Sequence, residues 1–228
     1  MNTVYADFRS VCAGQLLDVS LYVQRNRTSS DVVDAHALAL KTSPARYPIS
    51  RVEVVAHNVP TTAMNVVLNN VVHGQLPRRM LVFFVLNEQY KGSYTLNPFE
   101  FGNFKIDTLS LFVDGIQFPS KPYQPNFTKG HSIREMIDFF RAMNQLDYES
   151  NINIDREEFN GAPIFGFNFA EGCDGVNVSG YGNEIRKGTI MIHVSFRNAL
   201  MKPINMITFS EYDNNIEIDQ DYNINLDY

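Results

Sequence analysis

Short segments with the spacing of β-strands follow one another along most of this chain, and they limit the fold more than any other feature of the sequence. Most of them alternate apolar and polar residues, while RMLVFFVLN, from Arg79 onward, is apolar throughout, as in a strand covered on both faces. Eight such segments begin at Arg51: residues 51–57, 79–86, 108–113, 115–119, 164–169, 189–196, 205–212 and 216–224. Many short strands separated by turn residues predict a mainly β protein, either a β-sandwich or a barrel.

The dipeptide Asp114–Gly115 marks the clearest turn in the sequence. Apolar residues stand on both sides of it, in TLSLFVDGIQFP. Asp-Gly accepts the positive φ angles of a type I′ turn, whose twist matches that of the flanking strands. The sequence therefore predicts a β-hairpin that joins residues 108–113 to residues 115–119.

The N-terminal part of the chain mixes strand and helix signals. LLDVSLYV, residues 16–23, alternates and predicts a strand. SSDVVDAHALALKT, residues 29–42, begins with polar N-cap residues and predicts a helix that ends near Ser43–Pro44. TAMNVVLNNVVHGQLP, residues 62–77, follows neither period clearly, and we assign it to a helical turn and a loop.

One further helix is expected in HSIREMIDFFRAMNQL, with a second, shorter one after it. Ser132 and Glu135 have the S-x-x-E spacing of a capping box. Four apolar residues follow at the i, i+3, i+4 and i+7 positions of one helix face: Ile133, Met136, Ile137 and Phe140. Asp155 and Glu158 predict the second helical turn.

Three carboxylates near the C-terminus stand two residues apart, at Glu217, Asp219 and Asp221. On a strand, alternate residues share a face, so these three would form the solvated face of a strand whose isoleucines point inward. A glycosidase built on Glu217 and Asp221 is the alternative. Its two carboxyl groups would have to lie within ~5–9.5 Å of each other. Residues four apart on a regular strand are about 13 Å apart, so the spacing favours the solvated strand.

The charge of the chain limits its partners. There are 19 Lys and Arg against 25 Asp and Glu, for a net charge of -6. Proteins that bind nucleic acid directly need clustered Lys and Arg on their surface, so we expect no such binding. No apolar run approaches the ~18 residues of a membrane span, and the N-terminus does not have the pattern of a secretion signal.

The cysteines and histidines give no sign of a metal or disulfide framework. Cys12 and Cys173 are far apart, which fits synthesis in a reducing compartment, the cytoplasm or the nucleus. None of the five histidines pairs with another at the spacing of metal ligands. His193 lies on the polar side of an alternating segment and is expected at the surface. We therefore expect no metal site.

Glycines mark a long polar segment, EGCDGVNVSGYGNEIRKG, at residues 171–188. It is either a plain surface crossover between strands or a contact loop, since recognition often resides in loops. The sequence leaves both alternatives open.

The segment from His73 to Phe127 contains five short motifs: Gly74, Gln75, Leu76 and Pro77; Gly92, Ser93 and Tyr94; Asn97, Pro98 and Phe99; Asp114 and Gly115; and Pro119, Lys121, Pro122, Gln124 and Pro125. In this combination of motifs the segment resembles the capsid proteins of Polinton (Maverick) elements and the related adintoviruses. Near the C-terminus, ITFSEYDNNIEID, which contains Glu217 and Asp219, is similar to a second family pattern. The likeness extends from about Leu16 to the C-terminus.

This resemblance implies a specific fold and role, with no enzyme activity and no cofactor. The family proteins are double jelly-roll major capsid proteins similar to the adenovirus hexon, and three copies of such a chain form one capsomer. This chain resembles their C-terminal half. The resemblance therefore implies an eight-stranded jelly-roll β-sandwich with one or two inserted helices, located in the virion. Its expected partners are copies of itself, with a trimer favoured, or other capsid chains, and the family motifs are expected to serve structure and assembly.

The half-length match also implies a division of the chain. Residues 47–228 would form one jelly roll, while residues 1–46 would be a strand and connecting helix left from a preceding one. The strand FGFNFAEGCD departs from the family pattern. The alternative role is that of a truncated or host-adopted capsid relative that binds a protein or a glycan.

Overall fold

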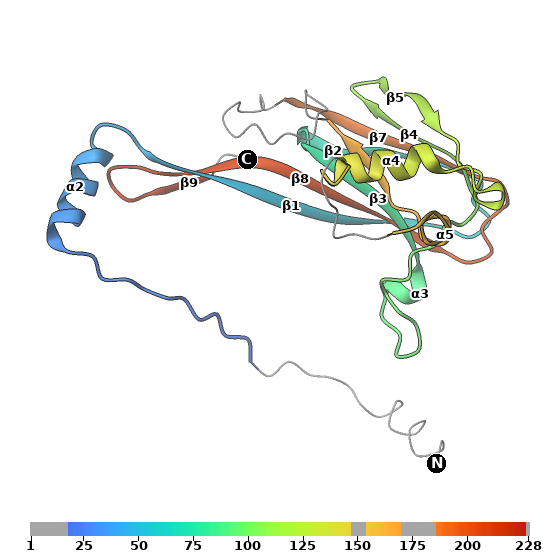
Figure 1. Ribbon diagram of the computed structural model, residues 1–228, viewed down its shortest axis with the longest axis horizontal. Coiled ribbons are helices and arrows are strands. Elements are labelled where there is room, and N and C mark those ends of the chain that lie inside the picture. Colours follow the sequence, from blue (N-terminus) through green and yellow to red (C-terminus); the bar gives the residue numbers. More distant parts are fainter. Residues whose placement is uncertain (1–17, 147–153, 170–185, 227–228) are drawn as a thin grey trace, which may run out of the picture. The chain divides into compact units, whose positions relative to one another are not determined.

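The computed structural model of this chain describes residues 18–146, 154–169 and 186–226. The chain divides into two compact units: residues 1–46 with 217–225, and residues 47–216 with 226–228. The smaller unit contains helix α2 (Ser30–Leu40) and the turn that follows strand β8. The larger unit contains two β-sheets and the remaining helices (Figure 1).

The strands of the larger unit form a sandwich of two sheets, with four strands in the main order of each sheet. The first sheet has the order β1 (Ala45–Val59), β8 (Ile204–Ile218), β3 (Arg79–Leu86) and β6 (Phe165–Asn168). The second has the order β2 (Asn65–Gln75), β7 (Lys187–Phe196), β4 (Ile106–Val113) and β5 (Ile116–Tyr123). A short strand, β9 (Ile224–Leu226), pairs with β8 outside this order.

The strand order identifies the fold as a jelly roll. The first strand pairs with the eighth, the second with the seventh, the third with the sixth and the fourth with the fifth. This nested pairing is the one obtained by folding a long antiparallel hairpin over on itself into two facing sheets. The expectation of a mainly β, eight-stranded jelly-roll sandwich is confirmed.

Alternating apolar residues fill the space between the sheets. On β7, every second residue from Ile190 to Phe196 is buried, and on β3 the buried series is Met80, Val82 and Phe84. The Phe84 ring lies edge-on to Phe165 at 6.5 Å and to Phe196 at 6.2 Å between ring centroids. Phe84 therefore links β6 of one sheet to β7 of the other.

Two of the predicted secondary-structure assignments are wrong. Residues 62–77 do not form a helical turn and loop, because Asn65–Gln75 is strand β2. Residues 205–212 and the beginning of 216–224 are not two strands but one, β8, which runs to Ile218 and is followed by a turn. The predicted number of eight strands agrees with the sandwich, but the set of strands differs: β2 was not predicted, and two predicted strands belong to β8.

The strand predicted over residues 16–23 is absent from the part that the structure describes, residues 18–23, which is exposed and in no strand. The helix predicted over residues 29–42 is confirmed as α2. None of its side chains is buried.

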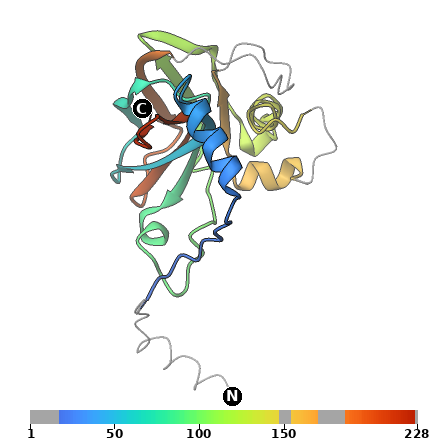
Figure 2. The same cartoon turned by 90° about the vertical axis from the view of Figure 1, so that its left-hand side faces the viewer.

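The remaining helices lie in the connections between strands. They are α3 (Asn87–Tyr90), the 3-10 turn η1 (Phe127–Lys129), α4 (Ile133–Ala142) and α5 (Arg156–Gly161). Helices α4 and α5 are adjacent and lie beside the sheets (Figure 2). The second predicted helical turn is confirmed as α5, and Asp155 and Glu158 form a capping box: the Glu158 amide donates to Asp155 at 2.8 Å, and the Asp155 amide donates to Glu158 at 3.1 Å.

The capping box predicted at Ser132 and Glu135 is wrong. Ser132 is the N-cap residue of α4, but its side chain makes no capping hydrogen bond and instead donates to the Asn160 side chain of α5. Burial raises the pKa of Glu135, although backbone amides of Glu135 and Gln124 donate to its carboxylate and oppose that rise.

The face that α4 buries is also not the predicted one. Ile133 and Ile137 are exposed, while Phe139 and Ala142 are buried against β6. Gly166 of β6 permits this close approach, because a Cβ atom there would lie 2.7 Å from the Ala142 Cβ and 2.7 Å from the Phe139 Cα. Arg79 of β3 fixes the end of the helix by donating to the Ala142 carbonyl at 3.1 Å.

Candidate assembly surfaces

The two sides of the sandwich are closed to different degrees. Strands β5 and β6 form one side, which we call the closed side. Helix α4 packs against β6, and β5 contains Pro119 and Pro122, which have no amide hydrogen to offer a further strand. Arg134 of α4 donates to the carbonyl oxygens of Lys121 at 2.8 Å and Pro122 at 3.1 Å, which occupies acceptors of β5. Edge-to-edge pairing is therefore blocked on this side.

Strands β1 and β2 end the two sheets on the other side, which we call the open side. Among the described residues, no further strand pairs with either outer edge. Val52 and Val54 of β1 are 48% and 60% exposed, and Val67 of β2 is 52% exposed. Exposed valines on an unpaired edge strand are a typical contact surface for another chain.

The inner face of β1 is polar near this edge. The Arg51 guanidinium lies 4.2 Å from the centroid of the Tyr212 ring and donates to Asn214 at 3.3 Å. Burial, and secondarily the nearby Glu53, raise the pKa of Tyr212. Gln75 at the end of β2 accepts a hydrogen bond from Asn214 at 3.1 Å and donates to the Asp213 carbonyl at 3.0 Å. These contacts hold β1, β2 and β8 together where the apolar core ends.

His57 on β1 has an uncommon environment, from which we expect a pH-dependent stability. Its Nε2 atom is buried and has no hydrogen-bond partner within the described residues. Burial lowers the pKa of His57 below 6.5. Because the unfolded chain then binds the proton more readily, the contribution of His57 to stability is full above about pH 6.5 and is lost as the pH falls towards the pKa of the folded state.

Urea unfolding at pH 7.5 and pH 5.0 tests this expectation. His57→Leu should reduce the loss of stability on acidification, whereas His73→Leu, a change at an exposed histidine, should not. An equal pH dependence in wild type and His57→Leu would contradict the role assigned to His57.

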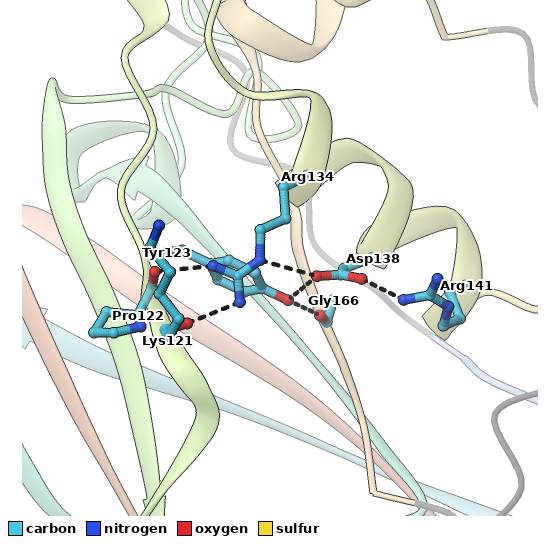
Figure 3. Close-up of polar contacts among 7 residues, drawn as sticks. All are labelled: Lys121, Pro122, Tyr123, Arg134, Asp138, Arg141 and Gly166. Carbon is cyan, nitrogen blue, oxygen red and sulfur yellow. Dashed lines mark hydrogen bonds and ion pairs between the residues drawn. The ribbon is translucent and has the colours of Figure 1, made fainter.

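A polar cluster fastens α4 to the closed side (Figure 3). The Tyr123 hydroxyl of β5 lies 3.0 Å from Asp138 and 3.1 Å from the Gly166 carbonyl of β6. Arg141 donates to Asp138 at 2.6 Å, and Arg134 lies 3.9 Å from it. Burial is the main cause that raises the pKa of Tyr123, and the Asp138 charge adds to it. The phenol therefore remains protonated and holds both a strand edge and a helix.

Sequence reasoning missed this cluster. The Arg134–Asp138 and Asp138–Arg141 spacings, i,i+4 and i,i+3, are the signal that could have revealed it, because side chains so spaced meet on one helix face. The third member, Tyr123, lies on a different element, and no local pattern predicts its approach.

The first group of residues that carry the sequence resemblance lies where β2 ends. Gln75 makes the contacts to β8 given above, and the Leu76 amide donates to the Arg186 carbonyl at 2.8 Å. Leu76 also packs against the core, and Pro77 is buried. Gly74, at the start of the motif, pairs with Gly188 of β7.

The second group of motif residues shapes the loop after α3, which projects away from the sheets (Figure 1). The Gly92 amide donates to the Gln89 carbonyl at 3.2 Å, and the Ser93 hydroxyl lies 3.1 Å from that of Thr95. Asn97 accepts from the Phe99 amide at 3.0 Å, an Asx turn that contains Pro98. Tyr94 and Phe99 are exposed.

The third group lies at the β4–β5 hairpin and along β5. Asp114 and Gly115 have φ angles of 50° and 82°, so the predicted turn with two positive φ angles is confirmed. Asp114 also accepts from the Thr189 amide at 2.8 Å, which fixes the hairpin to β7. Pro119, Lys121 and Pro122 lie beside Arg134, while Pro125 accepts from Arg197 at 3.1 Å. The motif residues thus occupy separate turns and strands and do not form one cluster.

The carboxylates near the C-terminus do not share one strand face, which corrects the prediction. Glu217 is on β8 and pairs with Arg46 at 2.8 Å. Asp219 follows the strand and accepts from the amides of Asp221 at 2.9 Å and Asn223 at 2.8 Å. Hydrogen bonds from Asn223 are the main cause that lowers the pKa of Asp219. Asp219 organises a turn, because a carboxylate that accepts two backbone amides fixes the chain around it.

Other candidate features are outside these surfaces. Cys12, Cys173 and nearly all of the glycine-rich segment lie outside the described residues. His193 is half-buried and stacks on Phe112 at 4.5 Å between ring centroids. Within residues 18–146, 154–169 and 186–226, no three or more His, Cys, Asp or Glu gather as metal ligands. No helix in the same ranges is both long and apolar enough to cross a membrane.

Comparisons with known proteins give structural neighbours only. No family model and no curated protein sequence matches the chain. Similar solved structures include a cryo-EM structure of the Sputnik virophage (15% identity, 81% of this chain and 39% of that chain, TM-score 0.47). A PBCV-1 virus capsid structure is also similar, with 8% identity over 82% of this chain and 52% of that chain, and a TM-score of 0.44. The mavirus major capsid protein has 12% identity over 81% of this chain and 41% of that chain, and a TM-score of 0.40. The chain corresponds to between 39% and 52% of the length of these proteins.

Proposed function

We propose that this chain is a structural subunit of a virus capsid, which assembles with copies of itself or with other capsid chains and catalyses no reaction. Jelly rolls occur in capsid proteins but also in lectins and cupins, so the fold does not decide the function. The observation that carries the proposal is the open side, with exposed Val52 and Val54 on an unpaired β1 edge. An apolar sheet edge is a surface that a subunit covers when it assembles.

The sequence motifs support the same role and specify it further. Many of the motif residues lie in turns and at strand ends, where contacts between capsid subunits would form. Their pattern supports a relation to the Polinton and adintovirus capsid proteins, and with it a location in the virion. Residues 1–46 are then the connection from a preceding jelly roll. The net charge of -6 favours partners other than nucleic acid.

The solution mass of the chain, measured by light scattering over a concentration series, tests the proposal. We expect a closed oligomer, a trimer, that contains the open side in its interface. The double change Val52→Lys and Val54→Lys should weaken the association at least about tenfold, since lysine on an edge strand opposes pairing with another chain. Ile116→Lys is the matched control, because Ile116 is exposed on the β4–β5 hairpin and belongs to neither β1 nor β2.

Two outcomes would contradict the proposal. One is a wild-type chain that stays monomeric at every concentration and joins no capsid chain. The other is an oligomer whose association the double change Val52→Lys and Val54→Lys leaves unchanged. A strict monomer would favour the alternative of a host-adopted module that binds a protein or glycan, with the exposed Tyr94 and Phe99 of the α3–β4 loop as its first candidate surface.

A further inference from the structure

Two adjoining hollows run along α4 and form one surface, which we call the α4 groove. Their volumes are about 620 and 540 Å³, and both are lined by Ile133 and Arg134. The groove has five cationic lining residues, Lys121, Lys129, Arg134, Arg141 and Arg156, and two acidic ones, Glu135 and Asp138. On a chain whose net charge is -6, this is a local reversal of sign.

Three of these cations are not neutralised within the described residues. Arg134 and Arg141 are engaged by Asp138. Lys121, Lys129 and Arg156 are exposed and form no ion pair with any described carboxylate. Exposed Ile133 and Ile137 lie among them. The groove therefore fits a segment that combines carboxylates with apolar side chains.

The chain itself contains a segment of this kind. From Pro203 to Tyr228 it has six acidic residues and no Lys or Arg: Glu211, Asp213, Glu217, Asp219, Asp221 and Asp227. The turn at residues 217–224, which we call the acidic turn, is fixed by Asp219 as described above. In this turn the side chain of Tyr222 is 62% exposed and that of Ile224 is 66% exposed. The acidic turn thus presents carboxylate and apolar groups together on a preorganised backbone.

We propose that the α4 groove binds the acidic turn of a second copy of this chain. This inference rests on the proposed function and names one contact of the assembly. Opposite charges on the two surfaces orient the two copies relative to each other and disfavour other partners. Because the groove and the turn are different surfaces, the contact is heterologous, and repeated contacts close into a ring when the rotation between copies allows it. Three copies joined in this way form the expected trimer.

Charge reversal on each surface tests the contact in the full chain. The double variant Lys129→Glu, Arg156→Glu should weaken association at least about tenfold by light scattering, and so should Asp221→Lys. Asp219 and Glu217 are not substituted, because Asp219 accepts hydrogen bonds that fix the turn and Glu217 forms an ion pair with Arg46. The triple variant, which exchanges the charges of the two surfaces, should recover most of the wild-type association. Lys41→Glu, Lys91→Glu is the control, with the same change in net charge away from the groove.

A labelled peptide of residues 214–226 separates failure of this inference from failure of the proposed function. Its fluorescence anisotropy should rise with added wild-type chain but not with the Lys129→Glu, Arg156→Glu variant, and a scrambled peptide should bind at least about tenfold more weakly. If the chain assembles but groove reversal changes nothing, the inference fails and the proposed function stands. If the chain is monomeric and joins no capsid chain yet binds the peptide at the groove, the proposed function fails, whereas the recognition of the acidic turn by the groove stands. Equal binding of the scrambled peptide would overturn the inference by showing a general anion surface.

Discussion

Replacing Phe84 with alanine is expected to lower the free energy of unfolding by about 3–5 kcal/mol, the usual range for removing a fully buried phenylalanine. The side chain has 0% exposure and touches aromatic rings of both sheets, Phe165 and Phe196. The change removes the apolar area of one ring and two edge-to-face contacts, and it leaves a cavity between layers held at both edges by other strands. The core cannot close over such a cavity without moving a sheet.

Equilibrium urea unfolding, followed by tyrosine fluorescence and circular dichroism, measures this loss. Phe99→Ala is the matched control, since Phe99 is 78% exposed in the loop after α3 and its truncation should change stability by no more than about 0.5 kcal/mol. Similar losses for both variants would mean that Phe84 does not join the two sheets in the way described.

Gly166→Ala is expected to destabilise the closed side by about 1–3 kcal/mol, the range for forcing an extra methyl group into a packed site. The new Cβ would lie 2.7 Å from the Phe139 Cα and 3.0 Å from the Asp138 carbonyl oxygen, both backbone atoms of α4. Because backbone atoms cannot rotate away as side chains do, the helix must move off β6. That movement would lengthen the hydrogen bonds of the Tyr123 hydroxyl to Asp138 and to the residue 166 carbonyl.

The control for this prediction is Gly161→Ala at the end of α5, where an added Cβ meets nothing within 4 Å. That variant should be neutral or slightly more stable, because alanine restricts the unfolded chain. Hydrogen exchange of the α4 amides supplies a second measurement, and Gly166→Ala should accelerate it locally. Unchanged exchange and stability in Gly166→Ala would refute the close packing of α4 on β6.

Elements that depend on interactions between residues close together in the sequence could be predicted, and elements that depend on distant residues could not. The Asp114–Gly115 turn and the capping box of Asp155 and Glu158 depend on residues within a few positions, and both were predictable. Strand β2 was not. Its pairing with β7 shifts register between Leu68 and Val72, and Asn70 has a φ of 52°. This irregularity breaks the alternation of apolar and polar residues that marks a strand.

The two errors at α4 and β8 have a tertiary origin. Helix α4 offers two apolar faces, and the choice between them depends on Gly166, a residue on another element that permits close contact with Phe139 and Ala142. Strand β8 continues through polar residues such as Asp213 and Asn214 because two residues from other parts of the fold bind them: Arg78, just before β3, and Gln75, at the end of β2 in the facing sheet. The candidate surfaces were even less predictable, because the α4 groove collects charges from β5, η1, α4 and α5.

The unequal sides of the sandwich also bear on misassembly. Amyloid growth requires that every molecule added to a fibre present a fresh backbone edge for the next one. Here α4 covers β6, and prolines interrupt β5, so the backbone edges of the described sheets remain available only along β1 and β2. A mistaken pairing of two molecules on the open side can be extended only through an edge of β1 or β2 that is still free, because the closed side offers no further edge. Strand addition is therefore limited to the open side of the sandwich, which restricts the ways in which two molecules can misassemble.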